Sequence, residues 1–293
     1  MRQAAGSSRL VLTGNLWSLA GYPSPEDEWS ELEKIRFYAE EGYEAVTMGG
    51  RPGLGKWLRD EAGLRLCGFF QATELKDLEP AYLAQVEAGA ETINCFLGTP
   101  ATSLEEGIKL FAELDRLERA CGIAVHAETH RATMLESPEF SFALYQASHS
   151  ESGRWPRLCH DNSHISVVKH LPLRQLAEFL TSNRNEALLQ RSHQMHLRPF
   201  NAHHAQVPVL DSAGRETREF RDWLEYVRPV TRAWQDAQES AGDLWVVPEL
   251  GPVVDGYGLS TGADVLEELR HCAMRIRELF SGPTRDTTPP LSG

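Results

Sequence analysis

Three side chains that can bind a metal ion or move a proton alternate near the middle of the chain. In the segment "IAVHAETHRAT" (123–133), His126, Glu128 and His130 occupy every second position. If this segment is a β-strand, all three side chains point to the same side of the sheet. A structural salt bridge at the end of a strand would explain the pattern without any function. A metal site or an acid–base site would explain it through chemistry.

Later segments end in side chains of the same kind. In chain order these are Asp161 and His164 in "HDNSH", His196 and Arg198 in "HQMHLR", and Glu249 in "VVPELGP". A single carboxylate at the end of a strand is more often a helix cap or part of an ion pair than a metal ligand. The recurrence over four successive apolar segments favours one shared site. Two glutamates, an aspartate and a histidine form a nitrogen and oxygen ligand set, which suits Mn²⁺, Mg²⁺, Zn²⁺ or Co²⁺ rather than a thiolate-bound metal.

These residues can meet only if the segments that carry them end at the same place in the fold. Eight segments are apolar, rich in β-branched or aromatic residues, and closed by polar residues, glycine or proline, as strands are. They are 9–17, 43–49, 64–71, 90–98, 122–128, 156–161, 192–198 and 243–249. Amphipathic segments between them predict helices over 24–41, 73–88, 103–122, 136–148, 170–182, 216–240 and 262–281, with a short helix within 53–63.

Capping residues predict where two of these helices begin. Ser24 precedes Pro25 and a run of acidic residues, which is typical of the first turn of a helix. Ser103 and Glu106 have the spacing of a capping box, and Gly122 stands at the end of the same segment.

Strand and helix patterns that alternate eight times, without a hairpin signal, predict a single (β/α)8 barrel over residues 9–281. In such a barrel, catalytic groups lie at the face where the strands end. An open doubly wound sheet is the alternative. However, "GGRPGLG" (49–55) lacks the G-x-G-x-x-G spacing of a dinucleotide-binding turn. Residues 1–8 and 282–293 have the composition of disordered ends.

The composition narrows the choice of partners. The chain has 293 residues and a formal net charge of −13, with no basic run of the kind that binds nucleic acid or an anionic membrane. No segment approaches the roughly 18 apolar residues of a membrane-spanning helix, and the N-terminal segment is unlike a signal peptide. The five cysteines are scattered without a CxxC pair. We therefore expect buried free thiols in a reducing compartment and a cytoplasmic protein.

Taken together, the motifs "HAETHR", "HDNSH", "HLR" followed by "AQVP", and "PELGP" resemble those of the xylose-isomerase-like TIM barrels. This group includes sugar isomerases and epimerases such as D-tagatose 3-epimerase and hydroxypyruvate isomerase, sugar-type dehydratases, and AP endonuclease IV proteins. The similarity in order and spacing covers nearly the whole chain, and its motifs lie between residues 126 and 252. As a set, these motifs are specific for the superfamily, but they say little about the substrate.

The resemblance implies one divalent metal ion held by Glu128, Asp161, His196 and Glu249, with Mn²⁺ expected ahead of Mg²⁺, Zn²⁺ or Co²⁺. It implies that the two glutamates act as the acid and base. Further expected substrate-binding residues are His164 and Arg198, which match the family pattern, His130 at the rim, and Trp17, whose ring could stack on a sugar. We interpret His126, which lies deeper in its strand, as a core histidine.

The expected function is that of a metal-dependent isomerase or epimerase that moves a proton on a small carbohydrate through an enediolate. The alternative is a metal-dependent lyase or dehydratase that acts on a keto-sugar, a keto-inositol or a 3-keto-glycoside. A non-catalytic sugar-binding barrel is less favoured. So is an endonuclease IV-like enzyme, which would need more metal ligands and a basic groove. We expect the long segment 198–216 to cover the site as a lid or to meet a partner subunit in a homo-oligomer.

Overall fold

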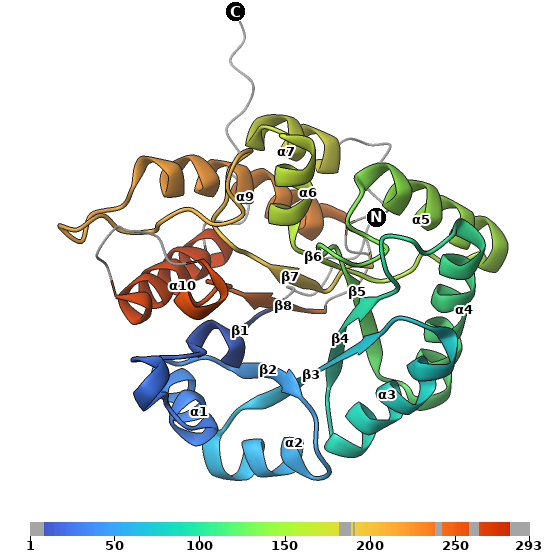
Figure 1. Cartoon of the computed structure of the whole chain (residues 1–293), viewed down its shortest axis with the longest axis horizontal. Coiled ribbons are helices and arrows are strands. Elements are labelled where there is room, and N and C mark those ends of the chain that lie inside the picture. Colours follow the sequence, from blue (N-terminus) through green and yellow to red (C-terminus); the bar gives the residue numbers. More distant parts are fainter. Residues whose placement is uncertain (1–8, 182–188, 190, 238–241, 258–263, 282–293) are drawn as a thin grey trace, which may run out of the picture.

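A computed structural model describes residues 9–181, 189, 191–237, 242–257 and 264–281. Eight parallel strands pair in sequence order, and the first also pairs with the last, so the sheet closes into a barrel (Figure 1). The strands are β1 (Arg9–Asn15), β2 (Ala45–Gly49), β3 (Arg65–Ala72), β4 (Thr92–Leu97), β5 (Ala124–Glu128), β6 (Leu158–His160), β7 (Gln194–His196) and β8 (Asp243–Val247). The predicted single (β/α)8 barrel is confirmed.

Helices surround the ring of strands, as Figure 1 shows. The described α-helices are α1 (Glu31–Glu40), α2 (Leu54–Trp57), α3 (Leu75–Ala88), α4 (Leu104–Cys121), α5 (Pro138–Ser152), α6 (Asn162–Lys169), α7 (Leu173–Thr181), α9 (Arg218–Ala237) and α10 (Val265–Ser281). Short 3-10 turns are η1 (Leu16–Leu19), η2 (Pro25–Asp27) and η4 (Val253–Asp255), and η3 (Leu58–Ala62) is a π-helical turn that continues α2. The predictions for residues 1–8, 182, 238–240, 262–263 and 282–293 lie outside the described residues.

The first helix begins later than predicted. Ser24 caps only the 3-10 turn η2, because the Trp29 N–H donates to the Tyr22 carbonyl instead of continuing a helix. Helix α1 begins at Glu31. The Ser30 hydroxyl accepts a hydrogen bond from the Glu33 N–H, and the Glu33 carboxylate accepts one from the Ser30 N–H. This capping box was overlooked in the sequence because Ser24 offered an earlier start of similar appearance.

The predicted helix over 170–182 is only partly correct. Its described part is α7, and a separate helix, α6, precedes it. Asp161 caps the start of α6 by accepting from the Ser163 N–H, and His170 ends it in the left-handed conformation with φ of 49°. Helix α6 was not predicted, because its polar first turn, "NSH", directly follows the predicted strand 156–161 and resembles the polar residues that close a strand.

Apolar strand residues divide between two clusters, one on each side of the sheet. Alternate strand residues, such as Leu12 and Leu66, belong to the main apolar core between strands and helices. Their neighbours Val11 and Cys67 belong to a second, small cluster with Ala45 and Trp245 inside the barrel.

All five cysteines are free and four are buried, whereas Cys121 is half-buried. Among the described helices, none is long and apolar enough to cross a membrane.

Candidate metal centre and active site

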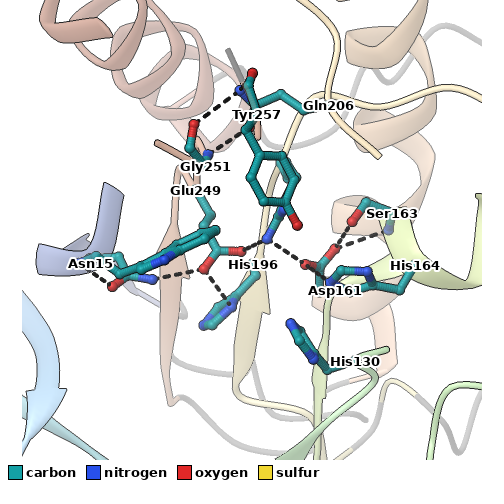
Figure 2. Close-up of polar contacts among 12 residues, drawn as sticks. Asn15, His130, Asp161, Ser163, His164, His196, Gln206, Glu249, Gly251 and Tyr257 are labelled. Atoms are coloured by element: carbon teal, nitrogen blue, oxygen red, sulfur yellow. Dashed lines mark hydrogen bonds and ion pairs between the residues drawn. The ribbon is translucent and has the colours of Figure 1, made fainter. Parts of the chain in front are cut away.

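Four predicted ligands meet at the C-terminal ends of four consecutive strands. Glu128 is the last residue of β5 and His196 the last of β7, while Asp161 directly follows β6 and Glu249 follows β8 by two residues. All four are buried, with at most 6% of any residue exposed. One ligand atom from each lies within 4.8 Å of the others. Figure 2 shows three of them, Asp161, His196 and Glu249, converging on one region.

The chemistry of this cluster fits a divalent cation. The His196 Nδ1 atom lies 3.3 Å from Glu128 Oε2 and 3.6 Å from Glu249 Oε1. Although both atoms are buried, neither Asp161 Oδ2 nor His196 Nδ1 has a hydrogen-bond partner in the described part of the chain. Three buried carboxylates this close together need positive charge nearby. Two buried donor atoms without partners and an excess of negative charge are what a hard cation would satisfy.

A second possible group of ligand atoms includes a thiol. Cys159 lies close enough to Glu128 and His196 to complete a three-residue set. Burial raises the pKa of Cys159 to about 12, so the group is a thiol and not a thiolate at neutral pH. The set with Asp161 and Glu249 is therefore the better candidate.

Arg198 supplies the cluster with a fixed positive charge. This residue is 1% exposed, and its Nη2 atom donates to Glu249 Oε2 and lies 3.3 Å from Asp161 Oδ2. Burial alone would raise the pKa of Glu249, but Arg198 and His196 outweigh it and lower that pKa to about 2. Burial is likewise outweighed at Asp161, where Arg198 and His164 hold the pKa well below its usual value.

The two glutamates have different surroundings. Both oxygens of Glu249 are engaged, since Oε1 accepts from Asn15 Nδ2 at 2.7 Å and Oε2 accepts from Arg198. In Glu128, Oε2 accepts from Asn94 Nδ2, while Oε1 has no hydrogen bond within the described residues. Glu128 therefore keeps one oxygen available, and Glu249 does not.

Asp161 is also a helix cap, so the structural explanation of this residue is partly correct. Its Oδ1 atom accepts hydrogen bonds from the Ser163 N–H at 3.0 Å and from the Ser163 hydroxyl at 2.6 Å. Its Oδ2 atom lies 3.3 Å from His164 Nε2 without hydrogen-bond geometry. One oxygen thus caps helix α6, and the other faces His164, as Figure 2 shows. The same oxygen lies 3.3 Å from Arg198 Nη2.

The histidines in and near the site differ in the direction in which their surroundings shift the pKa. Burial would lower the pKa of His196, but Cys159, Glu128 and Glu249 raise it well above its ordinary value. Burial lowers the pKa of His130, whose ring stacks on Phe96 with centroids 4.0 Å apart. Without a bound cation, the acidic neighbours of His196 therefore favour its protonated form, whereas burial favours the neutral form of His130. His126 is buried, as expected for a core histidine, and burial also lowers its pKa.

A cavity of about 440 Å³ opens beside the cluster. Three of the predicted substrate-binding residues line it, namely Trp17, His130 and Arg198. His164 is buried behind His130, with ring centroids 4.2 Å apart, and is not among the described lining residues. The remaining lining residues are Asn15, Leu16, Thr47, Met48, Gly49, Phe69, Gln71, Asn94, Phe96, Glu128, Arg131, His196, Glu249 and Asp255.

Asn15 and Asn94 were not identified from the sequence. Each donates a hydrogen bond to one of the two cluster glutamates. Asn15 is the last residue of β1, so the rule that located Glu128 and His196 could have found it. Asn94 lies inside β4 between apolar neighbours, and a buried amide in a strand is the signal that was available.

The segment 198–216 contacts the residues that follow β8 next to the site. The Gln206 side chain accepts from the Gly251 N–H at 2.6 Å and donates to the Tyr257 carbonyl at 3.3 Å. The Tyr257 ring in turn lies 4.9 Å from the Arg198 guanidinium carbon. This part of the predicted lid therefore holds the residues after β8, among them Tyr257, whose ring lies against the Arg198 guanidinium. Figure 2 shows Gln206 beside Gly251 and Tyr257.

Comparison with known proteins relates the barrel to solved structures. No model of a known protein family matches the sequence, and no curated protein matches it. A sugar phosphate isomerase/epimerase from Parabacteroides distasonis superposes with a TM-score of 0.55 at 12% identity, covering 96% of each chain. A xylose isomerase-like TIM barrel protein from Mycobacterium smegmatis, in complex with magnesium, gives 0.53 at 14% identity, covering 95% of this chain and 98% of the other.

A third solved structure is the probable 3-DHS dehydratase AsbF, involved in petrobactin synthesis, from Bacillus anthracis. It superposes with a TM-score of 0.53 at 12% identity, over 91% of this chain and 98% of the other. At such identities the likeness establishes the fold. The chain shares with these proteins the closed eight-stranded parallel barrel.

Proposed function

Starting from this fold, we propose that the chain is a divalent-metal-dependent enzyme that isomerises or epimerises a small sugar or sugar derivative. The observation that carries the proposal is the convergence of Glu128, Asp161, His196 and Glu249 within 4.8 Å at one side of a cavity. Both glutamates line the cavity, whereas Asp161 is not among its described lining residues. The structural neighbours include proteins described as a sugar phosphate isomerase/epimerase and as a magnesium complex, which supports the same reading.

The same four residues would hold the metal ion, which would supply positive charge to stabilise an oxyanion beside the reacting carbon. Glu128 would remove the proton from the carbon next to a carbonyl group, because its Oε1 atom is free of hydrogen bonds in the described residues and the residue faces the cavity. Asn94 would hold the other oxygen and so fix the carboxylate plane.

Glu249 would be the second member of the acid–base pair. Its pKa of about 2 keeps it ionised at neutral pH, so it holds no proton at the outset and is a weak base, and the first proton transfer therefore belongs to Glu128. Glu128 would then hold that proton and return it to the neighbouring carbon in an isomerisation, whereas Glu249 would deliver a proton only after taking one from a substrate hydroxyl group. Arg198 would act mainly by holding Glu249, and its Nε and Nη1 atoms are buried without a hydrogen-bond partner in the described residues. Trp17 would offer its ring to a sugar C–H face.

Metal binding gives the first test. Because the acidic neighbours favour the protonated form of His196 in the metal-free protein and a metal ligand must be neutral, we expect binding of Mn²⁺ to release up to about one proton at pH 7. Calorimetric titration in two buffers of different ionisation enthalpy measures that number, and elemental analysis gives the metal stoichiometry. Stoichiometric metal that survives in the double variant Asp161→Ala and His196→Ala would exclude these ligands.

The chemistry itself is tested in D₂O. The Mn²⁺-loaded protein is incubated with a panel of ketoses, aldoses and keto-inositols, and deuterium bound to carbon is measured by mass spectrometry and NMR. An isomerase or epimerase leaves a product that is heavier only by the deuterium, whereas a dehydratase gives a product lighter by one water. Absence of carbon-bound deuterium and of water loss across the panel would contradict the proposal.

A further inference from the structure

We propose that the cavity takes a sugar derivative with an anionic oxygen group, a carboxylate, which binds Arg131. The inference rests on the proposed function, because it assigns the substrate class of the same cavity. Arg131 lines the cavity three residues after Glu128, and its side chain is exposed at the rim.

Arg131 is held in place without being neutralised. Its Nη1 atom donates a hydrogen bond to the Tyr257 hydroxyl, and its guanidinium carbon lies 5.5 Å from the centre of the Tyr257 ring. Among the described residues, no carboxylate forms an ion pair with Arg131 within 4.0 Å, whereas Arg198 forms two such pairs. A neutral phenol orients the group but leaves its charge available.

The contrast with Arg198 shows why this matters. Both guanidinium groups line the cavity and both lie near the ring of Tyr257. Arg198 is buried and paired with Glu249 and Asp161, so its charge is already balanced. Arg131 is the lining guanidinium that lacks a carboxylate among the described residues.

Apart from the metal cluster and Arg198, the charged side chains among the described lining residues are Arg131 and Asp255. Three cluster carboxylates are balanced by Arg198 and a divalent ion when His196 is a neutral ligand. One further carboxylate, Asp255, lines the cavity and accepts a hydrogen bond from the Trp17 indole N–H. Asp255 and Arg131 do not form an ion pair with each other in the structure, so Arg131 can engage a charge brought by the substrate.

The geometry favours a carboxylate over a phosphate group. With Nη1 bonded to Tyr257, the Nη2 and Nε atoms remain for a planar two-oxygen partner. Apolar side chains make up much of the nearby wall, among them Trp17, Met48 and Phe96. A phosphate group usually gathers several cationic or backbone donors, and the described lining residues offer one unpaired guanidinium.

The experiment compares matched ligands on the Mn²⁺-loaded protein by calorimetry. D-Fructose and D-fructuronate differ at one carbon, which is a hydroxymethyl group in the first and a carboxylate in the second. We expect fructuronate to bind at least about tenfold more tightly. The preference should fall to about one in Arg131→Met, recover in part in Arg131→Lys, and persist in the control Arg174→Met, which changes an exposed arginine of α7.

Equal affinity for the two ligands, a preference that survives in Arg131→Met, or no binding of either ligand overturns the proposal. D-Fructose 6-phosphate forms a third arm, and an Arg131-dependent preference for it over fructuronate overturns the assignment to a carboxylate. The D₂O experiment tests the proposed function independently of the anion site. Selective binding without deuterium incorporation defeats the function alone, whereas incorporation with neutral ketoses and no preference for fructuronate defeats the anion site alone.

Discussion

At the scale of single residues, the division of labour between Glu128 and Glu249 follows from what each carboxylate touches. Glu249 is held on both oxygens by Asn15 and Arg198. Glu128 is held on one oxygen by Asn94. A carboxylate bound to a buried guanidinium contributes to stability and to charge balance, while a carboxylate with a free oxygen can accept a proton from a ligand.

The difference predicts unequal variants. Glu128→Gln should reduce deuterium exchange by about 10²–10⁴-fold with little change in the melting temperature of the metal-free protein. Glu249→Gln should reduce the exchange as well. In addition, it should destabilise the metal-free protein by about 2–4 kcal/mol, because Arg198 loses a charged partner. Exchange is measured at saturating Mn²⁺ and stability by urea denaturation. Glu105→Gln, which changes an exposed glutamate of α4, serves as control.

A larger stability loss in Glu128→Gln than in Glu249→Gln would reverse the assignment. The convergence of Glu128, Asp161, His196 and Glu249 was predictable, because acidic residues and a histidine at the ends of successive apolar strands are unusual enough to stand out. Asn94 was not, because its role depends on the register that sets it beside His126 in β5, two residues before Glu128, and a sequence does not state that pairing. The lack of an acidic partner at Arg131 could not be predicted either, because it is a property of the folded chain.

At the scale of elements, capping residues decide where helices begin, and these beginnings place part of the site. Asp161 caps α6 and stands in the metal cluster, so one side chain serves both the helix and the site. Strand and helix periodicity was sufficient to predict the eight strands and most helices. It failed at α1 and α6, where two overlapping polar signals competed and the hydrogen bonds of the folded chain selected one of them.

The start of α1 can be tested by a matched pair of variants. Ser30→Ala removes the capping hydroxyl of a ten-residue helix and should lower the free energy of unfolding by about 1 kcal/mol. Ser24→Ala removes the cap of a three-residue turn and should cost less than about 0.5 kcal/mol. Urea denaturation of both variants measures the difference. A larger loss in Ser24→Ala would restore the earlier helix start.

At the scale of the whole molecule, a closed sheet concentrates its polar groups at one end and leaves the rest of the interior apolar. The buried charges at that end make the stability of the protein depend on pH. Asp161 and Glu249 have lowered pKa values in the folded state, so both bind protons more readily when the chain is unfolded. Their contribution to stability is therefore present above the unfolded pKa, about 4.5 for a glutamate.

We expect this contribution to disappear as the pH falls from about 4.5 through the folded pKa of Glu249, about 2. The loss from Glu249 alone should be about 3 kcal/mol. Urea denaturation of the metal-free protein between pH 7 and pH 2.5 follows it, and Glu249→Gln should show a flatter dependence. A wild-type profile as flat as that of the variant would show that the pair with Arg198 does not control acid stability.

The hydrogen bond between Asn15 and Glu249 joins the first strand to the residues after the last one, across 234 positions of sequence. A ribosome adds residues at about 5–20 per second, so roughly 10–50 seconds separate the synthesis of these two partners. Until β8 has been synthesised, β1 lacks this pairing partner, and so does β7 once it has itself been made. The nascent chain therefore carries two open sheet edges and an incomplete site. Chaperones that shield such edges should matter most for this protein while it is being translated.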